Sequence, residues 1–195
     1  RLDGYLLESG RLMARGVLKR PVPSYLRARY FLNVPGVGRI VLKVLHRTGR
    51  LYRHRALRLA SRERAGLRLA QGLAVPRLAR ISSQTMRSML GFRPTAWVAQ
   101  AHVPGVSMRH VRINRAQVVG VWLFLAEQLE VLRRRCVLYT DLKASNVLVQ
   151  ARPLRVTQID FNYATAVRRG SYPAGYFGYT AGYEAPEHAR RPRLG

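Results

Sequence analysis

Carboxylate and amide side chains gather in one short part of the chain. Only three aspartates occur in 195 residues, and two of them, Asp141 and Asp160, each stand beside a short apolar run. Asn146 follows Asp141 closely. A carboxylate that orients a hydroxyl, with an Asp and an Asn that offer oxygen ligands to a hard cation, is the equipment of Mg²⁺-dependent phosphoryl transfer. We therefore expect catalytic chemistry here.

Lysine is scarce in this chain, which draws attention to Lys143. The 35 basic residues comprise 32 arginines and only three lysines, Lys19, Lys43 and Lys143. The two residue types are not interchangeable, because lysine is a compact point charge on a flexible stem. A position that keeps lysine against this bias is expected to need such a charge, and Lys143 lies between Asp141 and Asn146.

The two apolar runs beside the aspartates are expected to form a hairpin. Residues 146–149 and 156–159 are rich in β-branched side chains and are joined by Ala-Arg-Pro. Such a hairpin would bring Asp141 and Asp160 to one end of a small sheet. Asn114 is expected to cap a long helix that runs to about Arg134, before the hairpin, with an apolar, buried centre. Trp97 and Trp122 are expected to lie in the core.

The first hundred residues alternate strand and loop signals. Residues 30–34 and 39–45 flank Pro-Gly-Val-Gly and predict a hairpin. Apolar residues at helical spacing predict an amphipathic helix over 51–73. Strands are predicted at 75–81 and 96–103. The chain is therefore expected to be an α+β protein of two small lobes.

Composition limits the compartment and the partners. The net charge of +26 is spread along the chain, which fits an acidic partner and equally fits a general preference for arginine codons. The single cysteine, Cys136, excludes a disulfide framework and favours a reducing, intracellular compartment. The longest apolar run, 118–126, is too short to span a bilayer, so no membrane association is expected.

Four motifs in register resemble the eukaryotic-type protein kinases of the serine/threonine form. TDLKASN at 140–146 resembles the catalytic loop, and IDFN at 159–162 resembles the magnesium-binding element. GYTAGYEAPE at 178–187 resembles the end of the activation segment, after which the chain looks truncated. RIVLKVL at 39–45 resembles the strand that carries the phosphate-binding lysine, and Glu63 lies where its partner belongs.

This resemblance implies a protein-kinase-like two-lobed fold, with a strand-rich N-lobe and an incomplete helical C-lobe. Residues 1–99 would form the nucleotide-binding N-lobe, 100–108 the hinge, and 109–195 the partial C-lobe. It also implies ATP and Mg²⁺ as cofactors and a protein substrate, for which the basic charge suggests an acidic one. The oligomeric state stays open.

The resemblance assigns roles residue by residue. Asp141 would orient the substrate hydroxyl and accept its proton, and Lys143 would place a positive charge on the transferring phosphate. Asn146 and Asp160 would hold Mg²⁺. The nucleotide-binding set would comprise Gly10, Lys43, Glu63, Gln100, Ala101, Val103, Asn146 and Asp160, where the hinge residues would use their backbone toward the adenine. Thr180 would contact Asp141 and Lys143, which favours serine/threonine specificity.

The sequence departs from the kinase pattern at three places. Glu8 and Met13 stand where glycines would flank Gly10, which weakens the expected phosphate loop. Tyr139 and Thr140 replace a His-Arg pair, so the cation that pairs with a phosphorylated activation segment is missing. Asn162 replaces a glycine and is the residue that best tolerates a left-handed backbone in its place.

Three other functions fit parts of the sequence. A pseudokinase that acts as a scaffold is suggested by the degenerate glycine loop, although Lys43, Glu63 and Asp141 are all retained. A small-molecule phosphotransferase shares Asp141, Asn146 and Asp160, but Lys143 and the Ala-Pro-Glu motif argue against it. A basic nucleic-acid binder is suggested by charge alone, without a reading element.

Overall fold

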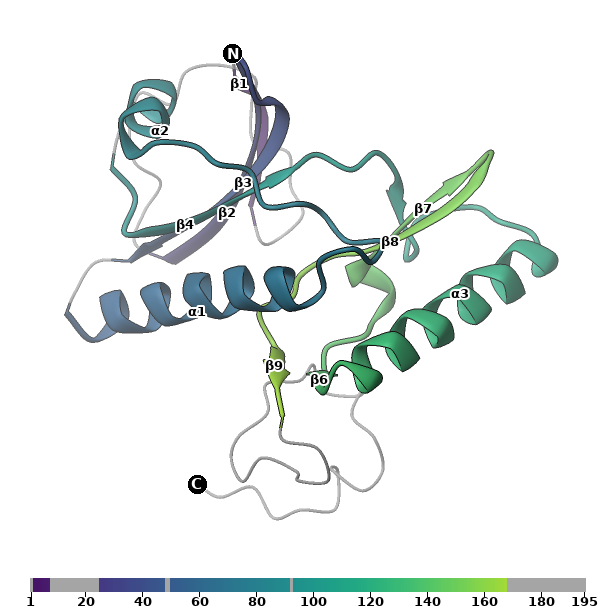
Figure 1. Cartoon of the computed structure of the whole chain (residues 1–195). Coiled ribbons are helices and arrows are strands. Elements are labelled where there is room, and N and C mark those ends of the chain that lie inside the picture. The colour runs from purple at the N-terminus through teal and green to yellow at the C-terminus, as the bar shows by residue number, and fades with distance from the viewer. Residues whose placement is uncertain (1, 8–24, 48–49, 92, 168–195) are drawn as a thin grey trace. The chain divides into compact units, whose positions relative to one another are not determined.

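The computed structural model describes residues 2–7, 25–47, 50–91 and 93–167 (Figure 1). The chain forms two compact units, and we describe each by itself. The first unit comprises Arg1–Arg68 and Pro76–Val103, and the second comprises Leu69–Val75 and Pro104–Gly195. Among the described helices, none has both the length and the apolar character needed to cross a membrane.

A four-stranded antiparallel sheet is the framework of the first unit. Its strands follow the order of the chain: β1 (Leu2–Leu7), β2 (Tyr25–Val34), β3 (Gly38–Arg47) and β4 (Ala96–Ala101). The hairpin predicted around Pro-Gly-Val-Gly is confirmed, with Val34 paired to Gly38. Gly36 and Gly38 have φ of +71° and +92°, a left-handed backbone that glycine adopts without a steric penalty.

The sheet alternates its side chains between a packed face and the face that bears Lys43. Helix α2 (Ser83–Leu90) packs on the first of these faces. The core there comprises Tyr30, Leu32, Val34, Ile40, Leu42, Val44, Met86, Leu90 and Ala99. Lys43 lies one residue out of phase with Leu42 and Val44, so its side chain leaves the opposite face. Register in β3 therefore decides where the lysine points.

Sequence reasoning missed helix α2, although both of its ends carry signals. The Ser82 hydroxyl oxygen accepts a hydrogen bond from the Thr85 N–H at 3.0 Å, which caps the first turn. Gly91 ends the helix with φ of +74° and donates its N–H to the Arg87 carbonyl at 2.9 Å. A serine cap followed by a glycine stop predicts a short helix.

Two of the predicted elements in the first hundred residues differ from the structure. Helix α1 (Arg50–Leu69) ends four residues before the predicted limit of 73, and the chain turns at Gly72, whose φ is +86°. The strand predicted at 75–81 is wrong. That segment makes a single bridge between Leu78 and Gln100. Pro76 lacks an N–H for a ladder, which limits pairing on that side.

The second unit holds helix α3 (Arg115–Arg134) and three small antiparallel pairings. The Asn114 side chain accepts from the Gln117 N–H and the Gln117 side chain accepts from the Asn114 N–H, which confirms the predicted cap as a capping box. β5 (Val106–Ser107), β7 (Val147–Ala151) and β8 (Leu154–Gln158) form one sheet, and β6 (Val137–Tyr139) pairs with β9 (Ala164–Ala166). The predicted hairpin is thus β7–β8.

Helix α3 covers this sheet with one face and exposes another. Val121 and Leu125 are buried with Val147, Val149 and Val156 of the hairpin. Val119, Trp122 and Leu123 are 51%, 55% and 62% exposed. Part of the apolar centre of this helix is therefore exposed. The placement of Trp122 in the core is wrong, because its direction on the helix differs from that of Val121 by a full 100° step. Trp97 is partly buried against the first unit's core.

The segment Leu69–Val75 is held in the second unit by hydrogen bonds to α3 and β8. The Gln128 side chain accepts from the Ala74 N–H at 3.1 Å, and the Gln158 N–H donates to the Ala74 carbonyl at 3.0 Å. The Arg135 guanidinium donates to the Gln71 carbonyl at 2.8 Å. These bonds satisfy backbone groups that would otherwise need water.

Candidate active site

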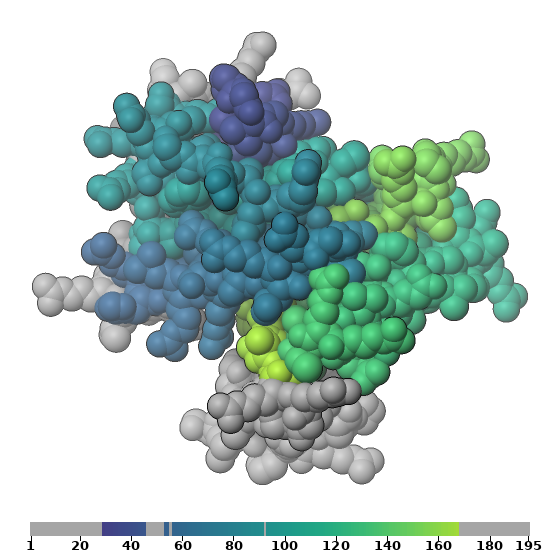
Figure 2. All heavy atoms as spheres, viewed as in Figure 1, coloured from purple at the N-terminus to yellow at the C-terminus, as the bar shows by residue number. Residues whose placement is uncertain are grey.

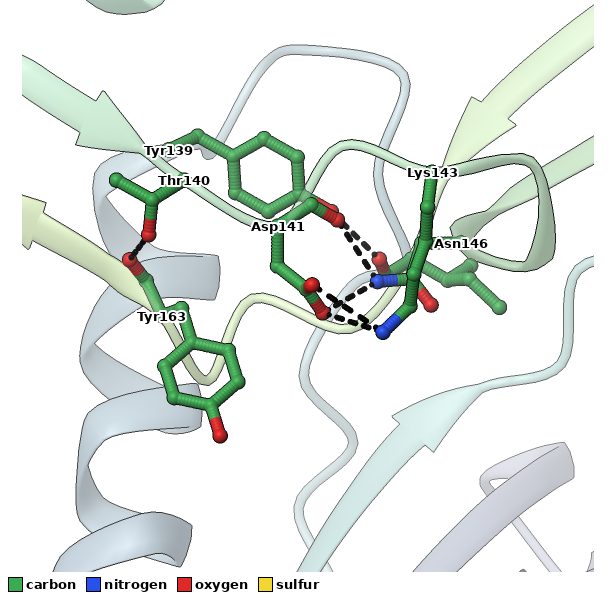
Figure 3. A network of polar contacts seen from close by, with 7 residues as sticks. Tyr139, Thr140, Asp141, Lys143, Asn146 and Tyr163 are labelled. Atoms are coloured by element: carbon green, nitrogen blue, oxygen red, sulfur yellow. Dashed lines mark hydrogen bonds and ion pairs between the residues drawn. The ribbon is translucent and has the colours of Figure 1, made fainter. Parts of the chain in front are cut away.

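Asp141 is the centre of a polar network in the second unit (Figure 3). The Asn146 amide nitrogen donates to the Asp141 carboxylate at 2.8 Å and to its backbone carbonyl at 2.9 Å. Lys143 Nζ lies 3.2 and 2.9 Å from the two carboxylate oxygens. The Asp141 side chain is only 2% exposed, so these partners compensate for the loss of water around the charge.

Local backbone structure places the three residues around one point. Strand β6 ends at Tyr139, and the following stretch leads into a single 3-10 turn, Ala144–Asn146, which continues directly as β7. The Asn146 N–H donates to the Lys143 carbonyl at 2.8 Å, which closes that turn. The Ser107 hydroxyl donates to the Ala144 carbonyl at 3.2 Å and ties the turn to β5. Sequence reasoning missed Ser107, and no motif marks it.

Asn146 directly precedes β7, and Asp160 follows β8 at the same end of the β7–β8 hairpin. Val147 pairs with Gln158, and the ladder continues with the Ile159 N–H, which donates to the Asn146 carbonyl at 2.8 Å. Asp160 itself has φ of +69°. A left-handed residue other than glycine carries strain and is often found at functional sites. Asn162, predicted to tolerate this conformation, does not adopt it.

The donor set at this end of the hairpin fits a magnesium ion. The Asn146 amide nitrogen is committed to Asp141, which leaves the Asn146 carbonyl oxygen as the side-chain atom able to bind a cation. With the Asp160 carboxylate, this provides two hard oxygen ligands. No cluster of three His, Cys, Asp or Glu side chains occurs in the described ranges. Mg²⁺ commonly takes few protein ligands and completes its shell with water and phosphate.

Tyr139 and Thr140 connect the catalytic stretch to the residues after Asp160 through neutral contacts. The Tyr139 ring stacks on Phe161 with 4.8 Å between centroids, and its hydroxyl donates to the Ile159 carbonyl at 3.2 Å. The Thr140 hydroxyl donates to the Tyr163 carbonyl at 3.3 Å (Figure 3). Thr140 stands where the kinase pattern has an arginine. It thus places a neutral hydroxyl against the backbone carbonyl of Tyr163.

In the first unit, Lys43 and Glu63 form the ion pair that their spacing suggested. The Lys43 ammonium donates to the Glu63 carboxylate, and the two side chains are 12% and 7% exposed. Lys43 comes from β3 and Glu63 from the buried face of α1, next to Ala60 and Leu67. Such a pair holds a lysine in place as a fixed cation with little freedom.

The predicted hinge residues differ in how their backbone groups are used. The Ala101 N–H donates to the Arg77 carbonyl at 2.7 Å, so it is committed within the first unit. The next N–H, of His102, donates to the Arg39 carbonyl at 2.9 Å. The Gln100 side chain is 4% exposed, and its Oε1 has no partner among the described residues. Val103, at the end of this unit, is partly exposed.

His102 lies beside these groups and is partly buried. Burial lowers the pKa of its imidazole, and the charge of Arg39 lowers it further. The ring meets Phe31 edge-on with 6.0 Å between centroids. The neutral form of His102 is therefore favoured. Gly10, Thr180 and the Ala-Pro-Glu motif at 185–187 lie outside the described residues.

Comparison with known proteins shows the fold. No protein-family model and no curated protein sequence matches the chain. Solved structures do match, among them the Rio2 kinase–ADP/Mg²⁺–phosphoaspartate complex from Chaetomium thermophilum, at a TM-score of 0.56 and 18% identity. The match covers 84% of this chain and 50% of that chain, so the chain spans half the length of the matched structure. The predicted α+β, kinase-like fold is confirmed.

Proposed function

We propose that this chain carries the catalytic residues of a protein serine/threonine kinase, which transfers the γ-phosphate of ATP to a protein hydroxyl. The observation that carries the proposal is the Asp141 network. A buried carboxylate is held from one side by Asn146 and from the other by Lys143, at the end of a hairpin that also delivers Asp160. Phosphoryl transfer depends mainly on positioning and electrostatics, and this network supplies both.

Each side chain then has a task. Asp141 orients the acceptor hydroxyl and takes its proton, because its carboxylate is fixed by the Asn146 amide. Lys143 is 21% exposed and sits on a flexible stem, so it can leave Asp141 to meet a phosphate oxygen. Asn146 and Asp160 would hold Mg²⁺, whose charge supports the negative phosphate oxygens when bound.

In the first unit, Lys43 would hold the α- and β-phosphates of ATP, and Glu63 would keep its ammonium in place. Ala101 donates its N–H elsewhere, so its carbonyl and the backbone of Val103 would meet the adenine. An ion-paired lysine is useful here because its charge is already aimed before nucleotide arrives.

A second candidate reaction transfers the phosphate to an aspartate. The matched Rio2 structure is a kinase–ADP/Mg²⁺–phosphoaspartate complex. In this chain Asp160 is partly exposed, whereas Asp141 is 2% exposed and held by two partners. Asp160 would therefore be the acceptor in such a reaction, and an acyl phosphate would form on its carboxylate as ADP leaves.

The location of the transferred phosphate tests these alternatives. Full-length protein is incubated with γ-labelled ATP, Mg²⁺ and an acidic protein such as dephosphorylated casein. Label that is stable to hydroxylamine and maps to serine or threonine supports the proposal. Label on the chain that hydroxylamine removes supports the phosphoaspartate reaction. Absence of transfer, with or without nucleotide binding, contradicts both and leaves the scaffold function.

A further inference from the structure

Helix α1 carries a large positive charge that its only acidic residue does not neutralise. Its sequence has seven arginines and one glutamate. That glutamate, Glu63, is buried and paired with Lys43. The arginines on the outer face of α1 therefore have no carboxylate partner in the same helix. Like charges one helical turn apart destabilise a helix by repulsion.

Three of these arginines lie on the outer half of the helix surface, where Arg58 and Arg62 are aligned and Arg68 is about 120° from Arg62 around the axis. Arg58 and Arg62 are one turn apart and Arg68 follows, and all three are exposed. At a rise of about 1.5 Å per residue, the three positions span about 15 Å along the helix axis. The residues that turn away from these positions, Ala56, Ala60, Glu63 and Leu67, are buried. The helix thus has an apolar inner face and a basic outer face.

Arg64 shows the contrast between an inward and an outward arginine. Its guanidinium lies 5.0 Å from the centroid of the Trp97 ring and donates to the Trp97 carbonyl. Burial lowers the pKa of Arg64, and the charge of Arg68 lowers it further. Arg58, Arg62 and Arg68 make no comparable bond with any described residue. They are available to a partner, and the repulsion between Arg58 and Arg62, one turn apart, favours one that is negative.

The same face offers an apolar contact. Leu57, next to Arg58 in sequence, is 45% exposed. The atoms of α1 form part of the surface seen in Figure 2, as the blue band across the middle. An acidic protein segment can place carboxylates about 6 Å apart, which matches Arg58 and Arg62, and can cover Leu57 with an apolar side chain. A nucleic acid would offer phosphates to the same arginines, and it is the competing partner that the test below separates.

We propose that the outer face of α1, formed by Leu57, Arg58, Arg62 and Arg68, docks an acidic segment of a partner protein. Binding neutralises the repulsion along α1 and thereby stabilises the helix. Because α1 also bears Glu63, the segment would reinforce the Lys43–Glu63 pair. The docking stands on the charge and exposure of α1, and only this last consequence rests on the proposed function.

Peptide binding to the full-length protein tests the docking. The probe is a fluorescent twelve-residue peptide with glutamates one helical turn apart and one leucine, and the control peptide has glutamine for each glutamate. The variant Arg58→Gln/Arg62→Gln/Arg68→Gln is expected to bind the acidic peptide about tenfold more weakly, since three exposed ion pairs are lost. Arg109→Gln/Arg112→Gln/Arg155→Gln removes the same charge from exposed sites of the second unit and is expected to change affinity less than about twofold.

Two outcomes would overturn the proposal. If both triple variants lose affinity equally, the peptide binds through the net charge of the protein and not through α1. If a single-stranded oligonucleotide of equal length binds more tightly than the peptide through the same three arginines, the partner is a nucleic acid.

A measurement on the unaltered protein tests the docking even if a variant folds poorly. Amide hydrogen exchange in α1 is expected to slow when the acidic peptide is added, and unchanged exchange in α1 would contradict the docking. No nucleotide is present in either assay, and Asp141→Asn is expected to bind the peptide as the unaltered protein does. A failure of the kinase proposal would therefore leave the result of the docking assay unchanged.

Discussion

The ammonium of Lys43 and the carboxylate of Glu63 form an ion pair that joins β3 to α1, although 20 residues separate them in sequence. Both side chains are nearly buried, so each charge depends on the other. The ion pair links the sheet to helix α1, whose outer face carries exposed arginines. It also yields a stability measurement that needs no assumption about activity.

Glu63→Gln should lower the free energy of unfolding by about 3 kcal/mol, because it removes the carboxylate that pairs with the nearly buried Lys43 ammonium. Chemical denaturation measures this loss. Glu127→Gln, on the exposed face of α3, is the matched control and should change stability by less than about 0.5 kcal/mol. The double variant Lys43→Met/Glu63→Leu should recover most of the loss. Equal stability of Glu63→Gln and the unaltered protein would contradict the ion pair.

Tyr139 should contribute through its ring more than through its hydroxyl. Tyr139→Phe keeps the ring, removes the hydrogen bond to the Ile159 carbonyl and should cost about 1 kcal/mol. Tyr139→Ala also removes the stacked contact with Phe161 and should cost about 3–5 kcal/mol. Thermal unfolding of both variants checks the order. A larger loss for Tyr139→Phe would mean that the hydroxyl, and not the ring, holds this region.

Thr140 leads us to expect a kinase that does not require phosphorylation of its activation segment. Its hydroxyl bonds the Tyr163 carbonyl without a charge that could pair with phosphate. Phosphatase-treated and untreated full-length protein should therefore turn over substrate at the same rate. In contrast, Thr140→Arg should make the rate sensitive to the treatment. A large drop in the unaltered protein after treatment would show that another cation serves the phosphate.

Glu130 should stay ionised to unusually low pH. Hydrogen bonds from Arg133 and then Arg134 lower the pKa of its carboxyl to about 2 from 4.5. Since the folded pKa is depressed, this contribution to stability is present above pH 4.5 and is lost as the pH falls through about 2. Carboxyl NMR titration should give a midpoint near 2 that rises toward 4.5 in Arg133→Gln/Arg134→Gln. A midpoint near 4.5 in the unaltered protein would rule out these bonds in solution.

Local signals predicted the parts of the fold that local chemistry decides. The turn at Gly36, the cap at Asn114 and the β7–β8 hairpin each depend on a few adjacent residues, and the structure has all three. The strand expected at 75–81 failed for the opposite reason. Apolar and β-branched residues alone do not supply a partner, and one bridge at Leu78 is all that forms.

Side-chain placement in the candidate site was predictable only in part. The spacing of Asp141, Asn146 and Asp160 around a hairpin indicated that they would meet. The bonds from Asn146 to Asp141 and from Ser107 to Ala144 depend on how the chain packs, which no spacing reveals. Trp122 shows the same limit, since helical periodicity cannot tell which of several apolar faces meets the sheet.

ATP turnover by Asp141→Asn tests the central claim most directly. The substitution keeps the size of the side chain and an oxygen that can accept the hydrogen bond from Asn146. It removes the carboxylate that takes the proton. Full-length protein with Mg²⁺ should lose at least about 10²-fold in kcat, because general-base catalysis contributes about that much. Nucleotide binding should be unchanged in the same variant. Equal turnover by Asp141→Asn and the unaltered protein would contradict catalysis at this site.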